Sequence, residues 1–396
     1  MNPDITPYYV INKNVLDDYW DMLYGSLEGS WGSNFKIGYS YKTNALPWLI
    51  KYMKNKGAFA ETVSHDEYLL AKYIGYDDSR IIYNGPYKDE RSFFSILEAG
   101  GIVNIDGDRE IGWLENNHSG KELAIGIRVN FELEKYCPGE TTMGDESSRF
   151  GFSYEDGHLA KAISRLKNIS NVRISGLHMH SSTKSRSVEA FRNIAQMACT
   201  VSGEFRLDPD YIDMGGGYCG GMSGRPEYPD YFPAISSELK KCFSPRKTTL
   251  IVEPGISMIS KCTKFISSVL DVKDVRGTRY VITDGSRFNL DPTMIKNSYL
   301  YTVEKKAGTE RDNKDEQIIC GFSCMEADRL FKMKDSGELL PGDRIIYQNV
   351  GGYTMALNPL FIQFFPPVYV FDDKNGYTMV RRKWEPKDYF CGDTEI

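Results

Sequence analysis

Lys42 closes the first strongly apolar, β-type run of this chain, in the string GYSYKTN. The amine of a lysine at such a strand end can form a Schiff base with a carbonyl group. Most lysines are instead solvated surface cations, so the string by itself is weak evidence of chemistry. Residues elsewhere in the chain must decide between these two interpretations.

Other reactive or conformationally special residues lie in later apolar runs or directly after them. Glu61 lies in the second run, Arg128 in the fifth, His180 at the end of the sixth, Gly215–Gly217 after the seventh and Glu253 at the end of the eighth. Each type has an ordinary explanation when taken singly, because histidines are often core or surface residues, glycines form turns and a glutamate before Pro-Gly can end a strand. Together they match the needs of one cofactor.

That cofactor combines a phosphate with a pyridine ring. Gly215–Gly217 would let backbone N–H groups approach the phosphate, and Thr183 and Tyr353 could add hydroxyl groups. A carboxylate at Glu253 would keep the pyridine nitrogen protonated, which makes the ring an electron sink for a carbanion. The sequence therefore predicts pyridoxal 5'-phosphate as the cofactor, attached at Lys42.

Two further side chains could contact the ring itself. The flat imidazole of His180 could stack on one face and leave the other face to the substrate. Arg128 could contact the phenolate side of the ring. The eight cysteines show no CxxC pair and no cluster with the spacing of a zinc site, so we expect free thiols and no metal.

The elements that would position these residues are short apolar runs alternating with longer segments between about residues 35 and 255. We count eight such runs: Phe35–Tyr41, Phe59–Val63, Ile81–Asn84, Ile102–Ile105, Leu123–Val129, Ile174–His180, Tyr211–Met214 and Leu250–Glu253. Eight parallel strands joined by crossovers predict an α/β TIM barrel, whose catalytic residues lie at the carboxyl ends of the strands. Apolar spacing predicts helices over Asp66–Ile74, Glu90–Ala99 and Val188–Val201.

The pattern of apolar residues changes after about Ile259. The shorter apolar runs there predict a mostly β C-terminal domain of barrel or sandwich type. We expect the barrel to span residues 13–258 and the second domain to combine 1–12 with 259–396, so that an N-terminal strand near Tyr8–Ile11 belongs to the second domain. The charged run Glu304–Gln317 predicts an exposed loop. The run Glu134–Ser148 either covers the active-site mouth or is simply a long surface loop.

Composition limits the classes of partner. The chain has 396 residues, 41% hydrophobic content and a net charge of −6, with its cations scattered singly. It can bury a large core and lacks the basic surface that nucleic acid or an anionic membrane would need. No apolar run approaches about twenty residues, and the N-terminal segment lacks the pattern of a signal peptide. We therefore expect a cytoplasmic protein with a small-molecule substrate, bound to neither nucleic acid nor membrane.

The motifs resemble those of the alanine-racemase-like pyridoxal-phosphate enzymes, and within them the ornithine and diaminopimelate decarboxylases, over nearly the whole chain. YSYKTN is similar to their lysine motif, LHMHSST to the histidine motif, IDMGGGY to the phosphate loop and IVEPG to the motif of the ring-nitrogen glutamate. AETVSHDEY is similar to the second-strand motif, with Glu61 where an aspartate is usual. CGFSCMEADRL resembles the cysteine motif, placing Cys324, and VGGYT resembles a motif whose tyrosine, here Tyr353, binds phosphate.

The resemblance implies a head-to-tail homodimer whose active sites are shared across the interface, with Lys42 from one subunit and Cys324 from the other. It also implies decarboxylation of an α-amino acid. The substrate amine would replace Lys42 on the cofactor, the carboxylate perpendicular to the ring would leave as CO2, and Cys324 or Lys42 would return a proton to the carbanion. Without its motif, Cys324 would be interpreted as a buried small hydrophobe.

Departures from the family pattern bear on the substrate. Diaminopimelate decarboxylases typically have a glutamate directly after the cysteine and an arginine after EPG, whereas this chain has Met325 and Ile256. Arg287 is the one arginine of a following segment and is not clearly at the family's position. Because an unpaired buried carboxylate is costly, we expect meso-diaminopimelate to be disfavoured. Glu326 and Asp328 could instead face a distal amine, or could simply begin a polar turn.

Two alternatives remain at this point. An amino-acid racemase could use the same barrel and the same lysine, but racemases of this fold use a tyrosine base from the partner subunit, so the Cys324 motif favours decarboxylation. A non-catalytic binding protein, similar to the antizyme inhibitors, would be expected to lose cofactor ligands that this chain keeps. We expect the substrate to be a basic amino acid or an amino-acid adduct of a biosynthetic pathway; its stereochemistry and pathway stay open.

Overall fold

A computed structural model describes residue 3 and residues 5–117, 120–142, 146–308 and 310–392 of the chain. Its contacts divide the chain into two compact units, Trp20–Ser257 and the combination of Met1–Tyr19 with Met258–Ile396. Within the described residues, no helix is both long and apolar enough to cross a membrane. The two units are described separately below.

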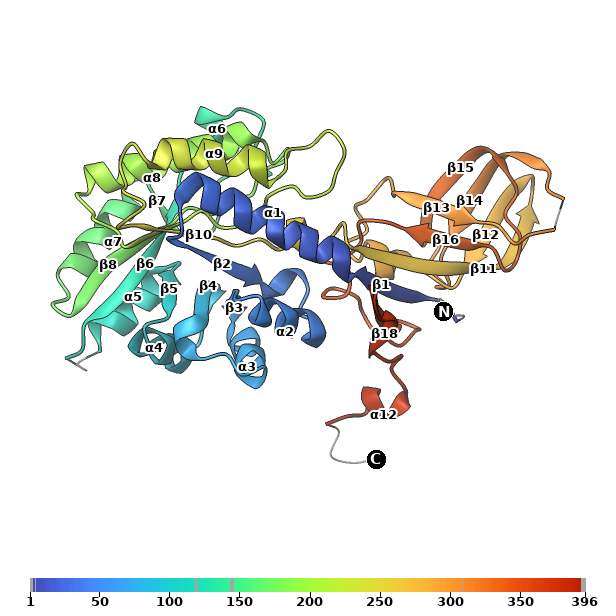
Figure 1. The fold of residues 1–396 in the computed structure, drawn as a ribbon, viewed down its shortest axis with the longest axis horizontal. Helices are drawn as coiled ribbons and strands as arrows, with labels where there is room; N and C mark the ends of the chain where they lie inside the picture. The colour runs from blue at the N-terminus through green and yellow to red at the C-terminus, as the bar shows by residue number, and fades with distance from the viewer. Residues whose placement is uncertain (1–2, 4, 118–119, 143–145, 309, 393–396) are drawn as a thin grey trace. The chain divides into compact units, whose positions relative to one another are not determined.

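The first unit is built on a closed parallel barrel, coloured from blue to yellow in Figure 1. Within the described residues its eight strands are β2 (Phe35–Ser40), β3 (Phe59–Ser64), β4 (Ile81–Tyr87), β5 (Ile102–Ile105), β6 (Leu123–Asn130), β8 (Val172–His178), β9 (Tyr211–Asp213) and β10 (Thr249–Val252). Pairing of β10 with β2 and of β5 with β6 closes the ring. The predicted TIM barrel is confirmed, and its strands follow the eight predicted runs.

Helices surround these strands (Figure 1). They are α2 (Pro47–Asn55), α3 (His65–Tyr73), α4 (Glu90–Glu98), α5 (Asp108–Glu115), α6 (Leu133–Tyr136), α7 (His158–Lys167), α8 (Val188–Glu204) and α9 (Tyr228–Leu239). The side chains of Ser64, Asp89 and Ser187 accept hydrogen bonds from the first turns of α3, α4 and α8. The three predicted helices are therefore confirmed, each beginning at a polar cap directly after a strand or loop.

The barrel interior is filled by side chains, as this fold requires. A buried cluster includes Phe59, Ile82 and Tyr211. Space for the Tyr211 ring comes from two glycines on neighbouring strands: a Cβ atom on Gly176 would lie 2.0 Å from the ring, and one on Gly126 would lie 2.2 Å from its hydroxyl oxygen. Any larger residue at either position would displace Tyr211 from the middle of the barrel.

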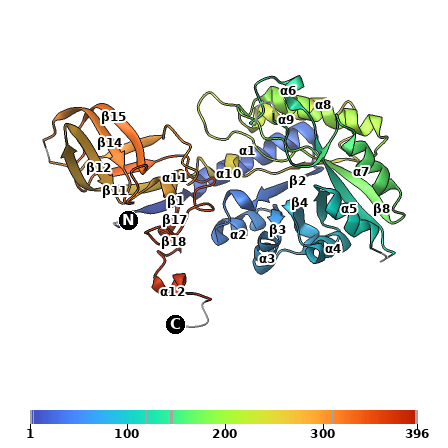
Figure 2. The same ribbon diagram turned by 180° about the vertical axis from the view of Figure 1, so that it is seen from behind.

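The second unit is mostly β (Figures 1 and 2). Its strands are β1 (Tyr8–Asn12), β11 (Thr263–Val275), β12 (Thr278–Thr283), β13 (Tyr301–Glu304), β14 (Asn313–Cys320), β15 (Arg329–Gly337), β16 (Arg344–Tyr347), β17 (Val368–Asp372) and β18 (Gly376–Arg381). They form one sheet in the order β15-β14-β12-β11-β1-β17-β18, with β16 joining β11 to β13. The N-terminal strand, predicted near Tyr8–Ile11, pairs with β11 and β17.

The remaining elements are short or connect other elements. They are α1 (Lys13–Trp31), β7 (Phe152–Ser153), α10 (Ile256–Ile259), α11 (Arg287–Leu290), α12 (Pro386–Tyr389) and the 3-10 turns Tyr41–Thr43 and Asp78–Arg80. The prediction of an exposed loop over Glu304–Gln317 is wrong for its second part, because β14 begins at Asn313 and pairs with β15. In that strand Gln317 is fully buried, whereas Asp315 is exposed and Lys314 and Glu316 are partly exposed.

Candidate active site

Lys42 lies in a 3-10 turn directly after β2, at the carboxyl end of the barrel. Its Nζ atom lies 2.8 and 3.1 Å from the two carboxylate oxygens of Glu61. Glu61 is on the adjacent strand β3, directly opposite Ser40, whose hydroxyl donates to the same carboxylate at 2.5 Å. The Glu61 side chain is fully buried, whereas that of Lys42 is 38% exposed.

Glu253 follows β10 and is buried. One carboxylate oxygen accepts a hydrogen bond from the Asn84 amide at 2.5 Å, and the other lies 3.7 Å from Nε2 of His178. Burial alone would raise the pKa of Glu253, but His178, Lys42 and a hydrogen bond with Asp213 hold this pKa well below its ordinary value. Burial and the negative charge of Glu253 raise the pKa of Asp213 well above its ordinary value. Glu253 is therefore the ionised member of this pair.

Two histidine rings face the same region. The rings of His178 and His180 are stacked, with centroids 6.2 Å apart. Burial and the nearby cations Arg128 and Lys42 lower the pKa of His180 to about 3. Nδ1 of His180 accepts a hydrogen bond from the backbone of Gly216 at 3.2 Å, as a neutral ring does. His180 is therefore a neutral, flat side chain at physiological pH.

His178 was not selected from the sequence. Its side chain is 2% exposed, and within the described part of the chain neither ring nitrogen makes a hydrogen bond. The sequence does contain a signal, since residues two positions apart in a strand face the same side, and His180 is two positions from His178. Burial lowers the pKa of His178 as well.

Gly215–Gly217 form a loop directly after β9. A Cβ atom on Gly215, whose φ is +64°, would lie 2.5 Å from the His180 side chain, and one on Gly216 would lie 2.3 Å from the backbone oxygen of Glu253. Asp213 accepts a hydrogen bond from the Gly215 N–H at 2.9 Å. The loop thus tolerates no side chains at its first two positions, which suits a segment that brings its backbone close to a ligand.

Strand β6 carries Arg128 and the loop after β8 carries Thr183, both at the same end of the barrel. The guanidinium of Arg128, near the end of β6, pairs with Asp106 at 3.1 Å and lies 4.8 Å from the centre of the Phe150 ring. Thr183 is half-buried in the loop after β8 and forms a β-bridge with Thr141. Arg128 is therefore a fixed cation, and Thr183 belongs to a contact between two loops.

That contact decides the position of the Glu134–Ser148 segment, of which residues 143–145 lie outside the described part. Besides the bridge at Thr141, the Glu140 carboxylate accepts hydrogen bonds from both the backbone and the hydroxyl of Ser185. The backbone N–H of Lys184 donates to the Glu140 carbonyl at 2.6 Å. The Glu134–Ser148 segment is thus hydrogen-bonded to the loop that follows His180, so it lies at the active-site end of the barrel.

Amide side chains connect the carboxylates inside the barrel, and sequence reasoning missed them. Asn84 donates to both Glu61 and Glu253, and Asn104 donates to both Asn84 and Asp213. Both asparagines lie within apolar strand runs, where a polar residue needs buried partners. Such a residue is a usable sequence signal, although it does not identify the partners.

The remaining predicted residues lie in the second unit. Cys324 is exposed, and Tyr353 is 40% exposed with a φ of +58°. The Glu326 side chain is 94% exposed and pairs with Arg329 at 2.7 Å. Arg287 pairs with Asp291 at 2.6 Å.

Asp328 has a different environment from the one considered for a substrate contact. It is buried, and its carboxylate accepts hydrogen bonds from the Ser286 hydroxyl at 2.9 Å and from the backbones of Arg287 and Ser323 at 2.9 and 3.1 Å. A Cβ atom on Gly321 would lie 2.3 Å from this carboxylate. The geometry favours the turn-forming role, because the carboxylate accepts hydrogen bonds from both of the loops that it joins.

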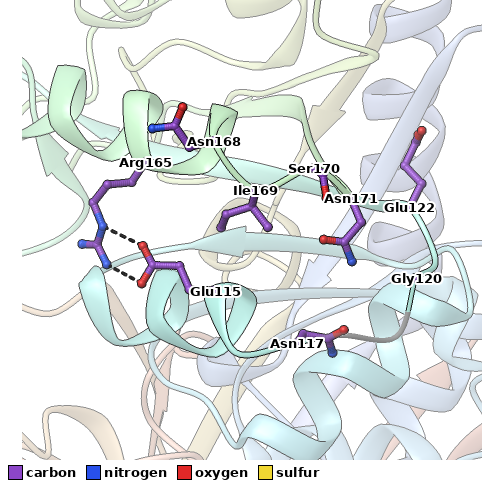
Figure 3. Close-up of a pocket in the computed structure, with 9 residues that line it drawn as sticks. All are labelled: Glu115, Asn117, Gly120, Glu122, Arg165, Asn168, Ile169, Ser170 and Asn171. Atoms are coloured by element: carbon purple, nitrogen blue, oxygen red, sulfur yellow. Dashed lines mark hydrogen bonds and ion pairs between the residues drawn. The ribbon is translucent and has the colours of Figure 1, made fainter.

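A hollow of about 810 Å³ lies elsewhere on the barrel (Figure 3). It is lined by residues that precede β6 and β8, including the ion pair of Arg165 with Glu115 at 3.0 Å. These segments lie at the amino ends of the strands, whereas Lys42 follows the carboxyl end of β2. The hollow is therefore separate from the candidate site, and its ion pair has both charges matched.

Comparison with known proteins agrees with the chemistry of this barrel end. Residues 26–260 match the family model described as "Pyridoxal-dependent decarboxylase, pyridoxal binding domain". The chain belongs to this family. Its cofactor is pyridoxal phosphate, and the fit is supported by the part-exposed Lys42 side chain and by a glycine loop whose first two positions leave no room for a Cβ atom.

Relatives of this pyridoxal-dependent decarboxylase extend over nearly the whole chain. A probable chloroplastic diaminopimelate decarboxylase of rice is 25% identical, covering 97% of this chain and 79% of its own length. An L-glutamyl-[BtrI acyl-carrier protein] decarboxylase of Niallia circulans is 22% identical, covering 97% and 92%. The crystal structure of the Methanocaldococcus jannaschii diaminopimelate decarboxylase with L-lysine has the same fold, with a TM-score of 0.84 at 21% identity, covering 99% of this chain and 92% of that one.

Proposed function

We propose that this family member removes the α-carboxylate of an amino acid other than meso-diaminopimelate, working as a homodimer through Lys42. The observation that carries the proposal is the Lys42 amine, held 2.8 Å from Glu61 on the same barrel end as the ionised, buried Glu253. When bound, pyridoxal phosphate supplies an electron sink that stabilises the carbanion left by departing CO2. The protein must supply attachment, orientation and proton control.

Each of these tasks has a residue suited to it. The Lys42 amine attaches the cofactor, and Glu61 accepts the amine's hydrogen bonds and holds it toward the middle of the barrel end. Glu253 places a negative charge where it can keep a ring nitrogen protonated. Gly215–Gly217 provide a backbone surface for the phosphate, with Thr183 and Tyr353 proposed as hydroxyl donors.

His180 and Arg128 complete the set. A neutral His180 ring can lie flat against an aromatic ring without adding a positive charge that would compete for the electrons of the carbanion. Arg128 is held by Asp106, so its guanidinium has a defined place if it contacts the phenolate side of the cofactor. The proposed role of His180 follows from its flat, uncharged ring, and that of Arg128 from its fixed positive charge.

The dimer proposal is supported by an exposed apolar segment in the second unit. Five large apolar residues within ten positions are exposed by 36–58%: Tyr353, Leu357, Leu360, Phe361 and Ile362. Contiguous exposed apolar side chains are typical of protein interfaces. Cys324 is exposed in the same unit, as a residue donated to a partner's site would be in a single chain. We propose that this thiol returns the proton to the reacting carbon.

The proposed exclusion of meso-diaminopimelate rests on charge. Ile256, a half-buried aliphatic residue, stands where the family usually has an arginine, and Met325 stands where it usually has a glutamate. Arg287 is already paired with Asp291. A distal carboxylate would therefore lack the arginine pair that usually balances it, and a buried carboxylate without such a partner is costly. A basic amino acid or a larger adduct fits better, and the Niallia circulans relative is named for a carrier-bound substrate.

The deciding experiment measures CO2 release by the protein supplemented with pyridoxal phosphate. The substrates are the D and L forms of lysine, ornithine, arginine and glutamate, together with meso-diaminopimelate, and each product is identified by mass spectrometry. Lys42→Ala is the control and should release no CO2. Release from a basic amino acid supports the proposal, whereas faster release from meso-diaminopimelate contradicts the substrate assignment.

Two further outcomes would favour the other functions. Exchange of the α-hydrogen in deuterated water without CO2 release would identify a racemase. Failure of the purified wild-type protein to bind pyridoxal phosphate would identify a non-catalytic relative and overturn the proposed reaction.

A further inference from the structure

Asn84, on β4, lies between the two carboxylates of the candidate site. Its Nδ2 atom donates to Glu61 at 3.0 Å and to Glu253 at 2.5 Å. All three side chains are almost completely buried, with exposed fractions of 2%, 0% and 4%. A single amide group thus uses both of its protons to join the carboxylate that holds Lys42 to the carboxylate assigned to the ring nitrogen.

The orientation of this amide is determined by its other contacts. The Oδ1 atom of Asn84 accepts a hydrogen bond from Nδ2 of Asn104 at 2.9 Å. Oδ1 of Asn104 in turn accepts from the Tyr211 hydroxyl at 2.8 Å, and its Nδ2 also donates to Asp213 at 3.3 Å. Exchanging the oxygen and nitrogen of the Asn84 amide would place its oxygen against two carboxyl groups and its nitrogen against Nδ2 of Asn104.

The position of Tyr211 makes this orientation rigid. Its ring occupies the space left by Gly126 and Gly176, so its hydroxyl is fixed in the middle of the barrel. Hydrogen bonds therefore run in one direction, from the Tyr211 hydroxyl through Asn104 and Asn84 to the carboxylates. Fully satisfied buried networks of this kind are stiff, and an unsatisfied member would be costly.

We propose that Asn84 is a positioning residue, which holds the carboxyl groups of Glu61 and Glu253 in a fixed relative orientation so that Lys42 and the cofactor ring are aligned. The proposal rests on the proposed function. Its physical basis is that two buried carboxylates repel each other, and a neutral group that donates a hydrogen bond to each one relieves this repulsion. An amide does so at every physiological pH, because it does not titrate.

The test is Asn84→Asp, which keeps the shape of the side chain and replaces the donor with a carboxylate oxygen facing Glu61 and Glu253. We expect the affinity for pyridoxal phosphate, measured by equilibrium dialysis, to fall about 10- to 100-fold, the effect of losing hydrogen bonds to charged groups. The matched control is Asn34→Asp. Asn34 is a half-buried amide directly before β2, with hydrogen bonds to Thr249 and Pro245, and its substitution should not change cofactor affinity.

A double variant separates positioning from a general loss of structure. Glu61→Gln combined with Asn84→Asp restores the original charge and again places an amide beside a carboxylate. If Asn84 acts through the carboxylates, the double variant should bind the cofactor at least about threefold more tightly than Asn84→Asp alone, because the two effects are coupled. Circular dichroism and thermal unfolding of the cofactor-free proteins confirm that each variant is folded.

The outcomes distinguish this inference from the proposed function. If wild type binds pyridoxal phosphate and Asn84→Asp binds it equally well, the positioning role is overturned while the decarboxylase proposal stands. Equal losses in Asn84→Asp and Asn34→Asp, or additive effects in the double variant, would also overturn it. If wild type itself binds no cofactor, the proposed function fails first.

Discussion

The Nζ atom of Lys42 lies 2.8 Å from a carboxylate oxygen of Glu61, across two neighbouring parallel strands. The contact follows from register, since Glu61 is directly opposite Ser40 and Lys42 is two residues further along the chain. An aspartate, which is usual in the family at this position, would be one methylene shorter. The longer side chain of Glu61 therefore affects the position of the Lys42 amine before this amine reacts.

Removing the charge of Glu61 should make Lys42 more reactive at neutral pH. In Glu61→Gln the amine loses its ion pair, so a larger fraction is uncharged and nucleophilic. We expect borohydride to trap the pyridoxal phosphate adduct of the variant at a lower pH than that of wild type. Mass spectrometry of the reduced peptide locates the adduct. An identical pH dependence of trapping in the two proteins would show that the ion pair does not determine the reactivity of the Lys42 amine.

Removing the charge of Glu253 should affect turnover more than folding. Glu253→Gln keeps the shape but supplies no negative charge to a protonated ring nitrogen, so kcat for CO2 release should fall about 10²- to 10³-fold, the usual effect of losing one such electrostatic contact. Glu238→Gln is the control, because Glu238 is also buried but pairs with Arg192 on the outer helices. A kcat within about threefold of wild type for Glu253→Gln would contradict the ring-nitrogen assignment.

Glu67 should make stability depend on pH. Burial, together with the negative charge of Glu61, raises the pKa of Glu67 to about 7. The folded state therefore holds this proton more tightly than the unfolded chain, and the free energy of unfolding should fall as pH rises from about 4.5 to 7 and then level off.

Glu67→Gln should remove this dependence. Its amide oxygen can still accept the hydrogen bond that Glu67 receives from the Val63 backbone at 2.8 Å. The variant should be more stable than wild type at pH 8, by on the order of 1 kcal/mol for a partly exposed group, and equally stable near pH 4. Urea unfolding of the cofactor-free proteins across this range measures the difference. Parallel curves for the two proteins would refute the pKa shift.

Cys324 should matter for proton return and not for cofactor binding. Cys324→Ala is expected to bind pyridoxal phosphate as wild type does, while releasing CO2 more slowly or placing the new proton incorrectly. Product chirality in deuterated water, together with kcat, reports on both effects. Cys391→Ala is a suitable control, since Cys391 is another exposed thiol. Unchanged rate and product in Cys324→Ala would remove the thiol from the mechanism.

The exposed apolar segment should be required for dimer formation. Leu357 is 48% exposed, and Leu357→Asp would place a charge in the proposed interface. We expect sedimentation velocity to show a shift from dimer to monomer, with loss of CO2 release. Val275→Asp is the control, because Val275 is similarly exposed at 49% but lies at the end of β11. A monomeric wild type, or an unaffected variant, would refute the shared-site dimer.

Much of the barrel and part of its site could be predicted because the signals are local. Each barrel strand is a short apolar run that ends in polar or glycine residues, so Lys42, the Gly215–Gly217 loop and Glu253 stand out at run ends. Parallel strands that close into a barrel bring their carboxyl ends together, which is why residues far apart in sequence could be assigned to one site.

The partners within the site were decided only by the tertiary structure. Asn84 and Glu253 are 169 residues apart, and they meet because β10 pairs with β2 and closes the ring. Asp328 shows the same limit, because a carboxylate in a loop can bind either a substrate or backbone N–H groups. The choice depends on the segment at Ser286, which is distant in sequence but contacts Asp328 in the folded chain. Sequence periodicity identifies which side chains point inward, whereas their hydrogen-bond partners depend on barrel closure and on the space that glycines leave inside it.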